Sequence, residues 1–540
     1  MLIKLSAFSG VIPSIDSTML PDGAAQVASD CKTGSGALKP FRSPVSVTVP
    51  TMKTGSKKTI WLYDDSGTRY WLHWQEEVNA VKSPLPSDSF KRIYWTGEGI
   101  PKMAPLAYAI TGGTGYPVAS YQLGLPSPTA PSAARVGTPG SDQTLDESRS
   151  YVIRYVSAYG EVGPPSSASN IVVVSPGNSV TVTLPTEAPS GLYHVASLDI
   201  FRTNTGTSTT EYQYVGNVAL GVPTYSDVKD SSALGFVLDS VDYLAPPSAL
   251  SGLITLPNGS LAGFYNNVLC VSVPHQPHAW PAAGQYSMAD KIISIGAFGN
   301  SILVTTAGAP YVATGSSYDA MSVERFEEGE ACVSKRATVD MGYAVIYPTP
   351  IGLRQVGVGG SKMLTAGVCT IDEWKLLQMD SANTFAMQYG DKYLAFTPAG
   401  TYMFNPTDGT YITLSSASTG TSVTAGYYEQ AAGKLFLCRA SEINQFDGSG
   451  SAIAATWKSK KFTAPYPVNI GALQVFASGA VTVNVYADGT LKHTAASIST
   501  NIPVRLPSGY RATHWEVEII SSSIVQQVLL ATTMAELSQV

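Results

Sequence analysis

The sequence Gly299-Asn-Ser-Ile-Leu-Val-Thr-Thr-Ala-Gly308 contains a short strand, a turn with glycine, and the start of a second strand that ends near Val312. The pattern returns as Gly342-Tyr-Ala-Val-Ile-Tyr-Pro-Thr-Pro-Ile-Gly352 and as Gly390-Asp-Lys-Tyr-Leu-Ala-Phe-Thr-Pro-Ala-Gly400. A looser copy, Gly433-Lys-Leu-Phe-Leu-Cys438, closes at Asn444-Gln-Phe446. The leading glycines lie about 43 to 48 residues apart, a period typical of four-stranded propeller blades. One such hairpin buries little surface alone, so the copies must stack on one another. We therefore predict an all-β fold, a β-propeller that occupies most of residues 248–453.

Upstream of this repeat, a hairpin with the same pattern lies between residues 51 and 122. Its strands are Thr59–Tyr63 and Arg69–Trp74, joined by the turn Asp64–Gly67, and a weaker strand follows at Arg92–Trp95. Alternating aromatic and β-branched residues around a glycine turn indicate a β-hairpin. We interpret residues 51–122 as the first blade, separated in sequence from the others.

Residues 123–247 have a different pattern, with proline-rich flanks at both ends. Tyr151–Val156 and Ser179–Leu184 alternate between apolar and polar residues, and Val195–Arg202 and Glu211–Val215 add two strands. This spacing is typical of a small antiparallel sandwich of about 110 residues. We predict an immunoglobulin-like or fibronectin-like sandwich inserted into a propeller loop.

The two ends of the chain are predicted to differ from each other. Residues 1–50 have turn residues every few positions and should form an extended arm that lies along other domains or another subunit. Residues 454–540 should form a second β module, with strands near Trp457–Phe462, Ala472–Phe476, Val481–Tyr486 and Trp515–Ile519. A single helix is expected at Thr370–Leu377, where Thr370 and Glu373 have capping-box spacing.

Composition limits the function classes. The 540 residues are too many for one core and should form three to four domains. Charged residues make up 13% of the chain, which favours short strands and a surface partly covered by other subunits. A net charge of −6 argues against an ordinary duplex-binding protein, which carries a basic face. The densest basic group, Lys458-Ser-Lys-Lys461, is interpreted as an exposed strand edge.

The cysteines and the hydropathy of the chain indicate the compartment in which it folds. The five cysteines (Cys31, Cys270, Cys332, Cys369 and Cys438) form no CxxC pair and no disulfide framework, which favours buried, reduced thiols in a protein folded in a cytoplasm. The N-terminal segment does not have the pattern of a secretory signal. No run of eighteen apolar residues occurs, so no membrane span is expected.

Several phrases, taken in order, resemble the tail nozzle (tail tubular B-like) proteins of short-tailed bacteriophages. Near the start they are Gly10-Val-Ile-Pro13, Leu20-Pro-Asp-Gly23 and Gly36-Ala-Leu-Lys-Pro-Phe-Arg42. Further along they are Tyr159-Gly-Glu-Val-Gly-Pro-Pro165, Pro274-His-Gln-Pro-His-Ala-Trp-Pro281, Cys332-Val-Ser-Lys-Arg336 with Gly352-Leu353, Trp457-Lys-Ser-Lys460 and Val504-Arg-Leu-Pro507. Each phrase alone is a turn or packing motif, and the resemblance rests on their order along the whole chain.

The resemblance implies a structural virion protein, assembled in the host cytoplasm, that forms a homohexameric ring at the distal end of the tail. Such a ring lies below the adaptor that joins the portal to the tail, carries tail fibres or spikes, and holds the genomic DNA until ejection. A net acidic chain fits a lumen along which phosphates slide without sequence recognition. Neither catalytic residues nor cofactors are expected from this class.

Patterns that suggest metal or phosphate chemistry have simpler interpretations. His275 and His278 are three residues apart, but no third ligand is evident and prolines extend this loop, so we expect no metal there. The segment Gly357-Val-Gly-Gly-Ser-Lys362 lacks the GxxxxGK[ST] spacing of a phosphate loop and is predicted to be a blade turn.

An enzymatic alternative depends on carboxylates and aromatic residues. Asp65-Ser-Gly-Thr-Arg-Tyr-Trp71 is similar to the Asp-box turn of sialidase-type propellers, which are glycosidases. Glycoside cleavage needs two carboxylates about 5 to 10 Å apart. The acidic groups available are Glu324, Glu327, Glu328 and Glu330, expected in a solvated loop, and Asp372 with Glu373, expected to cap a helix. Trp61, Trp71, Trp74 and Trp95 are expected to pack in a core or an interface, although tryptophans also stack on sugars. The alternative function is therefore a receptor- or glycan-binding propeller of the tail, which could also hydrolyse glycans.

Overall fold

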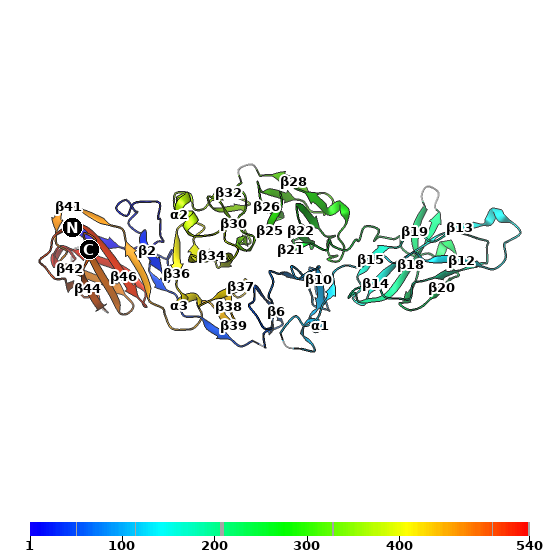
Figure 1. Ribbon diagram of the computed structural model, residues 1–540, viewed down its shortest axis with the longest axis horizontal. Helices are drawn as coiled ribbons and strands as arrows, with labels where there is room; N and C mark the ends of the chain where they lie inside the picture. The colour runs from blue at the N-terminus through cyan, green and yellow to red at the C-terminus, as the bar shows by residue number, and fades with distance from the viewer. Residues whose placement is uncertain (50, 114, 206–209, 327–328, 499–500, 538–540) are drawn as a thin grey trace.

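The protein is an elongated all-β molecule with three β bodies in a row (Figure 1). The computed structural model describes residues 1–540 except 50, 114, 206–209, 327–328, 499–500 and 538–540. A β-sandwich that contains both chain ends lies at one end, a propeller lies in the middle, and the inserted sandwich lies at the other end. This arrangement confirms the predicted fold class.

The propeller is a ring of small antiparallel sheets. Within the described residues, four of its sheets have four strands in consecutive order, a fifth combines three consecutive strands with one strand of the N-terminal arm, a sixth is a four-stranded part of a larger sheet, and one has two strands. The strands of the seven sheets are β6 (Thr59–Asp65) and β7 (Thr68–Trp74); β8 (Asn79–Lys82), β9 (Arg92–Thr96), β10 (Lys102–Pro105) and β11 (Tyr121–Gln122); β21 (Ser251–Thr255), β22 (Leu261–Tyr265), β23 (Val268–Val271) and β24 (Gln285–Ser287); β25 (Ile292–Phe298), β26 (Ser301–Thr306), β27 (Tyr311–Thr314) and β28 (Ser322–Arg325); β29 (Val339–Asp340), β30 (Ala344–Thr349), β31 (Gly352–Gly357) and β32 (Gly360–Met363); β33 (Phe385–Tyr389), β34 (Lys392–Thr397), β35 (Gly400–Phe404) and β36 (Tyr411–Leu414); β37 (Val423–Glu429), β38 (Lys434–Arg439) and β39 (Glu442–Gln445), completed by β5 (Val45–Val47). Around the centre of the ring, the first strand of each sheet contacts that of the next in the order β8, β21, β25, β29, β33, β37 and β6.

The repeated phrase occupies the same place in each of its four blades. Its strands are the second and third of the sheet, namely β26 and β27, β30 and β31, β34 and β35, and β38 and β39. The leading glycines Gly299, Gly342, Gly390 and Gly433 have φ values of 53°, 83°, 59° and 62°. Because residues with a Cβ rarely adopt this left-handed conformation, glycine is favoured at the turn that joins the first strand to the second.

The segment predicted as one first blade contains two separate sheets. The hairpin of β6 and β7 pairs as expected, with Asp64 Oδ1 accepting a hydrogen bond of 2.8 Å from Gly67 N in the turn. The strands β8 to β11 form their own four-stranded sheet beside it. The two sheets pack through Trp74 and Trp95, whose ring centroids lie 5.9 Å apart.

The inserted sandwich has its own core. Its sheets are β12 (Ser132–Val136), β17 (Ser179–Thr183) and β20 (Thr224–Asp227); β13 (Glu147–Arg149) and β16 (Val172–Val174); and β15 (Val162–Pro165), β14 (Tyr151–Ser157), β18 (Val195–Thr205) and β19 (Thr210–Ala219). Buried Tyr151, Ile153, Val182 and Ile200 fill the space between them. The chain enters and leaves this body at adjacent points, since a Cβ added to Gly124 would lie 2.8 Å from the Cα of Ala245.

The N-terminal arm forms part of two other bodies. β1 (Leu2–Leu5) pairs with β47, and β2 (Ala25–Ser29) lies between β36 and β40, while β5 closes the last blade beside β39. The C-terminal sandwich contains β40 (Ala455–Ser459), β41 (Phe462–Val468), β42 (Ala472–Ala477), β43 (Val481–Ala487), β44 (Thr490–Ile498), β45 (Val504–Arg505), β46 (Ala512–Ser521) and β47 (Val525–Ala531), and the arm adds a small pair, β3 (Cys31–Lys32) and β4 (Lys39–Pro40). A single apolar core joins this sandwich, the arm and the blade of β33 to β36.

Helices are few and short in the described part of the chain. They are α1 (Leu106–Ile110), α2 (Ile371–Leu376), α3 (Ser416–Thr419) and α4 (Met534–Leu537), with 3-10 turns η1 (Gln143–Leu145), η2 (Ser231–Ala233), η3 (Ala282–Gly284) and η4 (Lys335–Ala337). The expected helix is α2, and its capping box forms between Thr370 and Glu373.

The interpretation of Lys458–Lys461 as an exposed strand edge was wrong. β40 lies between β2 and β46, so it is an interior strand of its sheet. Lys458 Nζ lies 3.3 Å from a carboxylate oxygen of Glu516, and Lys460 Nζ lies 2.6 Å from Asp22. Lys458 therefore pairs β40 with β46, and Lys460 pairs with the N-terminal arm.

Candidate functional site

The two histidines of the Pro274–Pro281 phrase lie in different environments. His275 is exposed in a turn with φ of 58°, whereas His278 is buried against Val162 at the start of β15. Burial lowers the pKa of His278 to about 3, so the ring is neutral at pH 7. Among the described residues, no group of three His, Cys, Asp or Glu side chains is placed to hold a metal ion.

Two of the acidic residues considered for glycoside cleavage, Glu330 and Glu373, form hydrogen bonds with other parts of the fold. Glu324 is exposed on β28, and Glu327 and Glu328 lie outside the described residues. Glu330 accepts two hydrogen bonds from the guanidinium of Arg354. Glu373 caps α2 by accepting from Thr370 N at 2.7 Å.

The remaining singled-out residues have structural roles in the fold. Asp65 forms an ion pair of 2.6 Å with Lys91, and the turn at Gly357–Lys362 joins β31 to β32. Trp71, Trp74 and Trp95 are buried, while Trp61 is half-buried. The five cysteine thiols are free; four are buried and Cys369 is half-buried.

Two phrases of the sequence resemblance meet where the inserted sandwich joins the propeller. Glu161, from Tyr159–Pro165, reaches into the blade of β8 to β11, where its Oε1 accepts a hydrogen bond of 2.8 Å from Arg92 Nη1. Both side chains are about 95% buried. Arg92 Nε also donates to Asp88 Oδ2 at 2.8 Å. His278, from the Pro274–Pro281 phrase, packs against Val162 of the Tyr159–Pro165 phrase. These phrases therefore fix the orientation of the inserted body.

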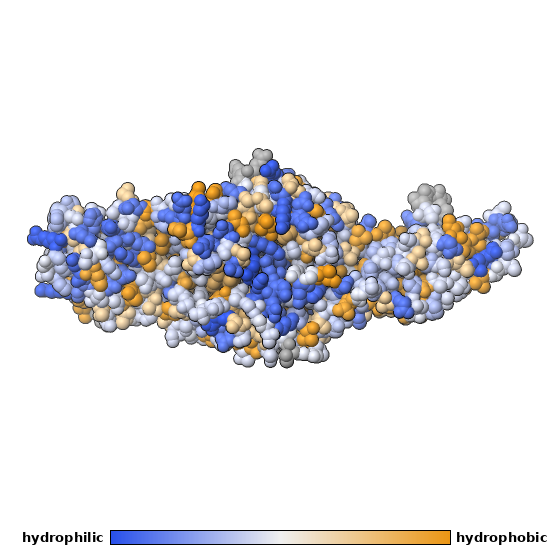
Figure 2. Space-filling view, viewed as in Figure 1, coloured by the Kyte–Doolittle hydropathy of each residue, from blue (hydrophilic) through white to orange (hydrophobic). Residues whose placement is uncertain are grey.

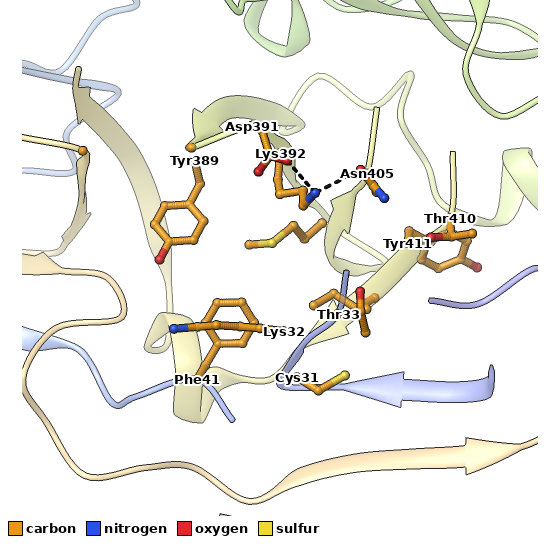
Figure 3. A pocket seen from close by; sticks show the side chains of 14 residues that line it. Cys31, Lys32, Thr33, Phe41, Tyr389, Asp391, Lys392, Asn405, Thr410 and Tyr411 are labelled. Carbon is orange, nitrogen blue, oxygen red and sulfur yellow. Dashed lines mark hydrogen bonds and ion pairs between the residues drawn. The ribbon is translucent and has the colours of Figure 1, made fainter. Parts of the chain in front are cut away.

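One cavity lies between the N-terminal arm and the blade of β33 to β36 (Figure 3). It encloses about 310 Å³. Cys31 and Phe41 form its apolar floor, and Asp391, Lys392 and Asn405 form a polar rim, in which Lys392 Nζ lies 2.8 Å from Asp391 Oδ2 and 3.0 Å from Asn405 Oδ1. The Lys392 charge is thus already neutralised. Burial raises the pKa of the Cys31 thiol to about 12, so it is a poor nucleophile at neutral pH.

A second cavity lies at the centre of the propeller. It encloses about 300 Å³ and is lined by β8, β21, β25, β29, β33 and β37 together with Lys335 and Arg336 of η4. Arg336 Nη2 donates to the carbonyl oxygens of Lys58 and Thr424, each at 3.0 Å. Lys335 Nζ lies 3.2 Å from Glu77 Oε1. Sequence reasoning did not assign a site to these residues, although Lys335 and Arg336 belong to the quoted phrase Cys332–Arg336.

Hydrophilic residues gather over the middle of the propeller in the space-filling view (Figure 2). They overlie the centre of the ring in Figure 1, between the bodies at either end. Within the described residues, no helix has the length and apolar composition needed to cross a membrane.

The geometry defines a class of protein: a β-propeller with an inserted β-sandwich and a C-terminal β-sandwich-like module. No family model matches the chain, and the search of curated proteins found no match. Similar solved structures include the "Neurospora crassa Pan2 WD40 domain", which is 7% identical with a TM-score of 0.26 over 52% of this chain and 86% of that chain. The "AfRom2 CNH domain" is 9% identical with a TM-score of 0.25 over 63% of this chain and 91% of that one.

A third similar structure, "Kluyvelomyces marxianus Hsv2", is 9% identical with a TM-score of 0.23 over 48% of this chain and 68% of that one. At such identities and TM-scores, none of these proteins supports an inference about what this chain binds or does.

Proposed function

We propose that this chain is a structural virion protein that forms the distal ring, or nozzle, of a short phage tail. It acts as a conduit and gate for genomic DNA, as a homohexamer that connects the adaptor and portal to tail fibres or spikes. The observation that carries the proposal is the linear order of the three bodies in Figure 1. A ring protomer of this shape can contact its neighbours through the propeller while its two ends reach different tail components.

Exposed apolar side chains on the inserted sandwich support an assembled state. Ile171, Leu192 and Val228 are 71%, 65% and 74% exposed, and Leu145 is 60% exposed. Figure 2 shows apolar residues gathered toward the far end of this body. Contiguous exposed apolar surface commonly marks a contact with another protein. Leu145 and Val228 also line one shallow cavity, so they lie near each other.

The net charge of the chain also supports a role as a conduit. A net charge of −6 would limit attraction between the ring and passing phosphates.

The proposal is tested by electron microscopy and light scattering of the purified chain, alone and mixed with its adaptor ring. We expect a sixfold ring, either free or assembled on the adaptor. The double variant Leu145→Asp, Val228→Asp should weaken assembly, because two charges would be buried in a contact. The matched control is Leu376→Asp on α2, where the native side chain is 73% exposed.

The glycan-binding alternative predicts a different result. A stable monomer that ignores the adaptor and binds or cleaves purified polysaccharide would overturn the nozzle proposal. If the purified chain alone forms no ring, the nozzle proposal is not contradicted, because the adaptor can serve as the template for assembly.

A further inference from the structure

The central cavity of the propeller carries more positive than negative side chains, although the whole chain is acidic. Lys58, Lys335 and Arg336 line it, against the carboxylates of Glu77 and Asp340. The whole chain has a net charge of −6. Side chains from several strands converge here, so the charged groups lie around one cavity of about 300 Å³. Such a cleft focuses its field on any small ion that enters.

Arg336 has unused hydrogen-bonding capacity in this cavity. Its Nη2 donates to two carbonyl oxygens, and its Nε and Nη1 donate to no residue within the described parts of the chain. The guanidinium lies over the ring of Phe385, with Cζ 4.8 Å from the ring centroid. Partial burial lowers the pKa of Arg336, and the nearby charge of Glu77 opposes this effect only in part. A guanidinium presents its donors in a planar fork that suits an oxyanion.

The other charges in the cavity leave the same excess. Lys58 is exposed, and its Nζ has no hydrogen-bond or ion-pair partner among the residues that the structure describes. Lys335 forms the ion pair with Glu77 described above. Asp340 Oδ1 is engaged by the backbone N–H of Gly342 at 2.6 Å, and the surrounding strands raise the pKa of this carboxyl.

Neutral hydrogen-bonding groups complete the lining. Asn79, Ser294 and Thr338 contribute to the cavity wall beside the cations. Cavities of roughly 300 Å³ or more are the usual size of small-molecule sites, with a few polar groups that fix orientation. The volume of about 300 Å³ accommodates a small ion with part of its hydration water.

We propose that the central cavity binds a small oxyanion with at least two negative charges, of the phosphate or short dicarboxylate class. Arg336 is the principal anchor, and Lys58 and Lys335 supply the further positive charge. The groups of this site all come from the propeller of one chain, so the site is complete without a second copy.

The experiment is a calorimetric titration of the full chain with inorganic phosphate and, separately, with succinate at constant ionic strength. We expect saturable binding of at least one anion. Lys58→Met should raise its Kd about two- to fivefold, which is the range for a solvent-exposed charge interaction. This variant keeps the Lys58 carbonyl that Arg336 uses. Glu77→Gln should lower the Kd about twofold, because it removes a competing carboxylate and frees Lys335.

The matched control is Lys492→Met on β44, an exposed lysine without a partner in the described structure. The Kd of the Lys492→Met variant for the anion should equal that of the unaltered chain. Failure of both anions to bind would overturn the proposal. So would an equal loss of affinity in Lys58→Met and Lys492→Met, since binding would then follow net charge and not the cavity. Thermal unfolding of each variant establishes that it is folded.

Discussion

At the scale of single residues, the junction between the inserted sandwich and the propeller shows why buried charges need partners. Glu161 and Arg92 are both buried, and they form an ion pair with each other. Asp88 adds a second carboxylate on Arg92, which lowers the pKa of Asp88 despite its partial burial. Removing one member of a buried pair leaves an uncompensated charge, which costs more than the pair contributed.

Because Arg92 retains Asp88, Glu161→Ala removes one charge-assisted hydrogen bond and is expected to destabilise the protein by about 2 kcal/mol. The measurement is the free energy of unfolding from urea denaturation. The control is Glu442→Ala, since Glu442 forms an exposed pair of 3.4 Å with Arg439, and it should change stability by less than about 1 kcal/mol. Equal effects of the two substitutions would show that the junction pair is not buried in solution.

His278 gives this junction a dependence on pH. Its pKa falls from an ordinary 6.5 to about 3, because burial and the nearby charges of Arg92 and Arg154 disfavour the imidazolium. Between these two pH values the unfolded chain binds a proton at this ring and the folded chain does not. The contribution of the neutral His278 ring to the free energy of unfolding is therefore fully present above pH 6.5 and is lost as the pH falls toward 3.

We expect His278→Leu to reduce the loss of stability between pH 7 and pH 5.5 by about 1 kcal/mol. Urea denaturation at the two pH values measures this difference. The control is His275→Asn, which changes an exposed histidine and keeps a residue tolerant of positive φ. His73, whose pKa burial lowers to about 4, should preserve part of the dependence in both variants. If His278→Leu left the pH dependence of the free energy of unfolding unchanged, the conclusion that the His278 ring is buried and neutral in the folded protein would be wrong.

At the scale of elements, local patterns predicted the hairpins but not their distant partners. The turn at Gly390 depends on backbone geometry within a few residues, so the sequence alone indicated it. The pairing of Leu5 with Val528 joins opposite ends of the chain, and no local pattern specifies it. The same limitation explains the error at Lys458, because β40 is an interior strand only through β2, which comes from the arm. The central cavity was not found because its lining comes from many separate strands.

The leading glycines allow a direct test of the turn argument. Gly390 has a φ of 59°, and a Cβ placed there would meet nothing within 4 Å. Gly390→Ala should therefore destabilise by about 1 kcal/mol through backbone strain alone. Gly359 also has open space around it but no positive φ, so Gly359→Ala should be neutral or slightly stabilising. Thermal unfolding of the two variants checks this contrast, and equal melting temperatures would contradict it.

At the scale of the whole molecule, the connections differ between the two end bodies. The C-terminal sandwich shares strands and a core with the arm and a propeller blade, so these parts should unfold together. The inserted sandwich has a separate core, and the chain enters and leaves it side by side. A domain whose ends meet in this way can be removed without stretching its host.

We therefore expect a variant in which residues 126–243 are replaced by a short Gly-Ser linker to keep the propeller and the C-terminal sandwich folded. Arg92 would lose Glu161 but retain Asp88 at 2.8 Å, which limits the cost of exposing the junction. Hydrogen exchange should show continued protection of β8 to β11 and β21 to β24, the blades on either side of the insertion. A control deletion of residues 251–287 removes one complete blade, so the ring could not close and cooperative unfolding should disappear. Loss of protection in both deletions would mean that the inserted sandwich is required to fold the propeller, and that the two bodies form one cooperative unit.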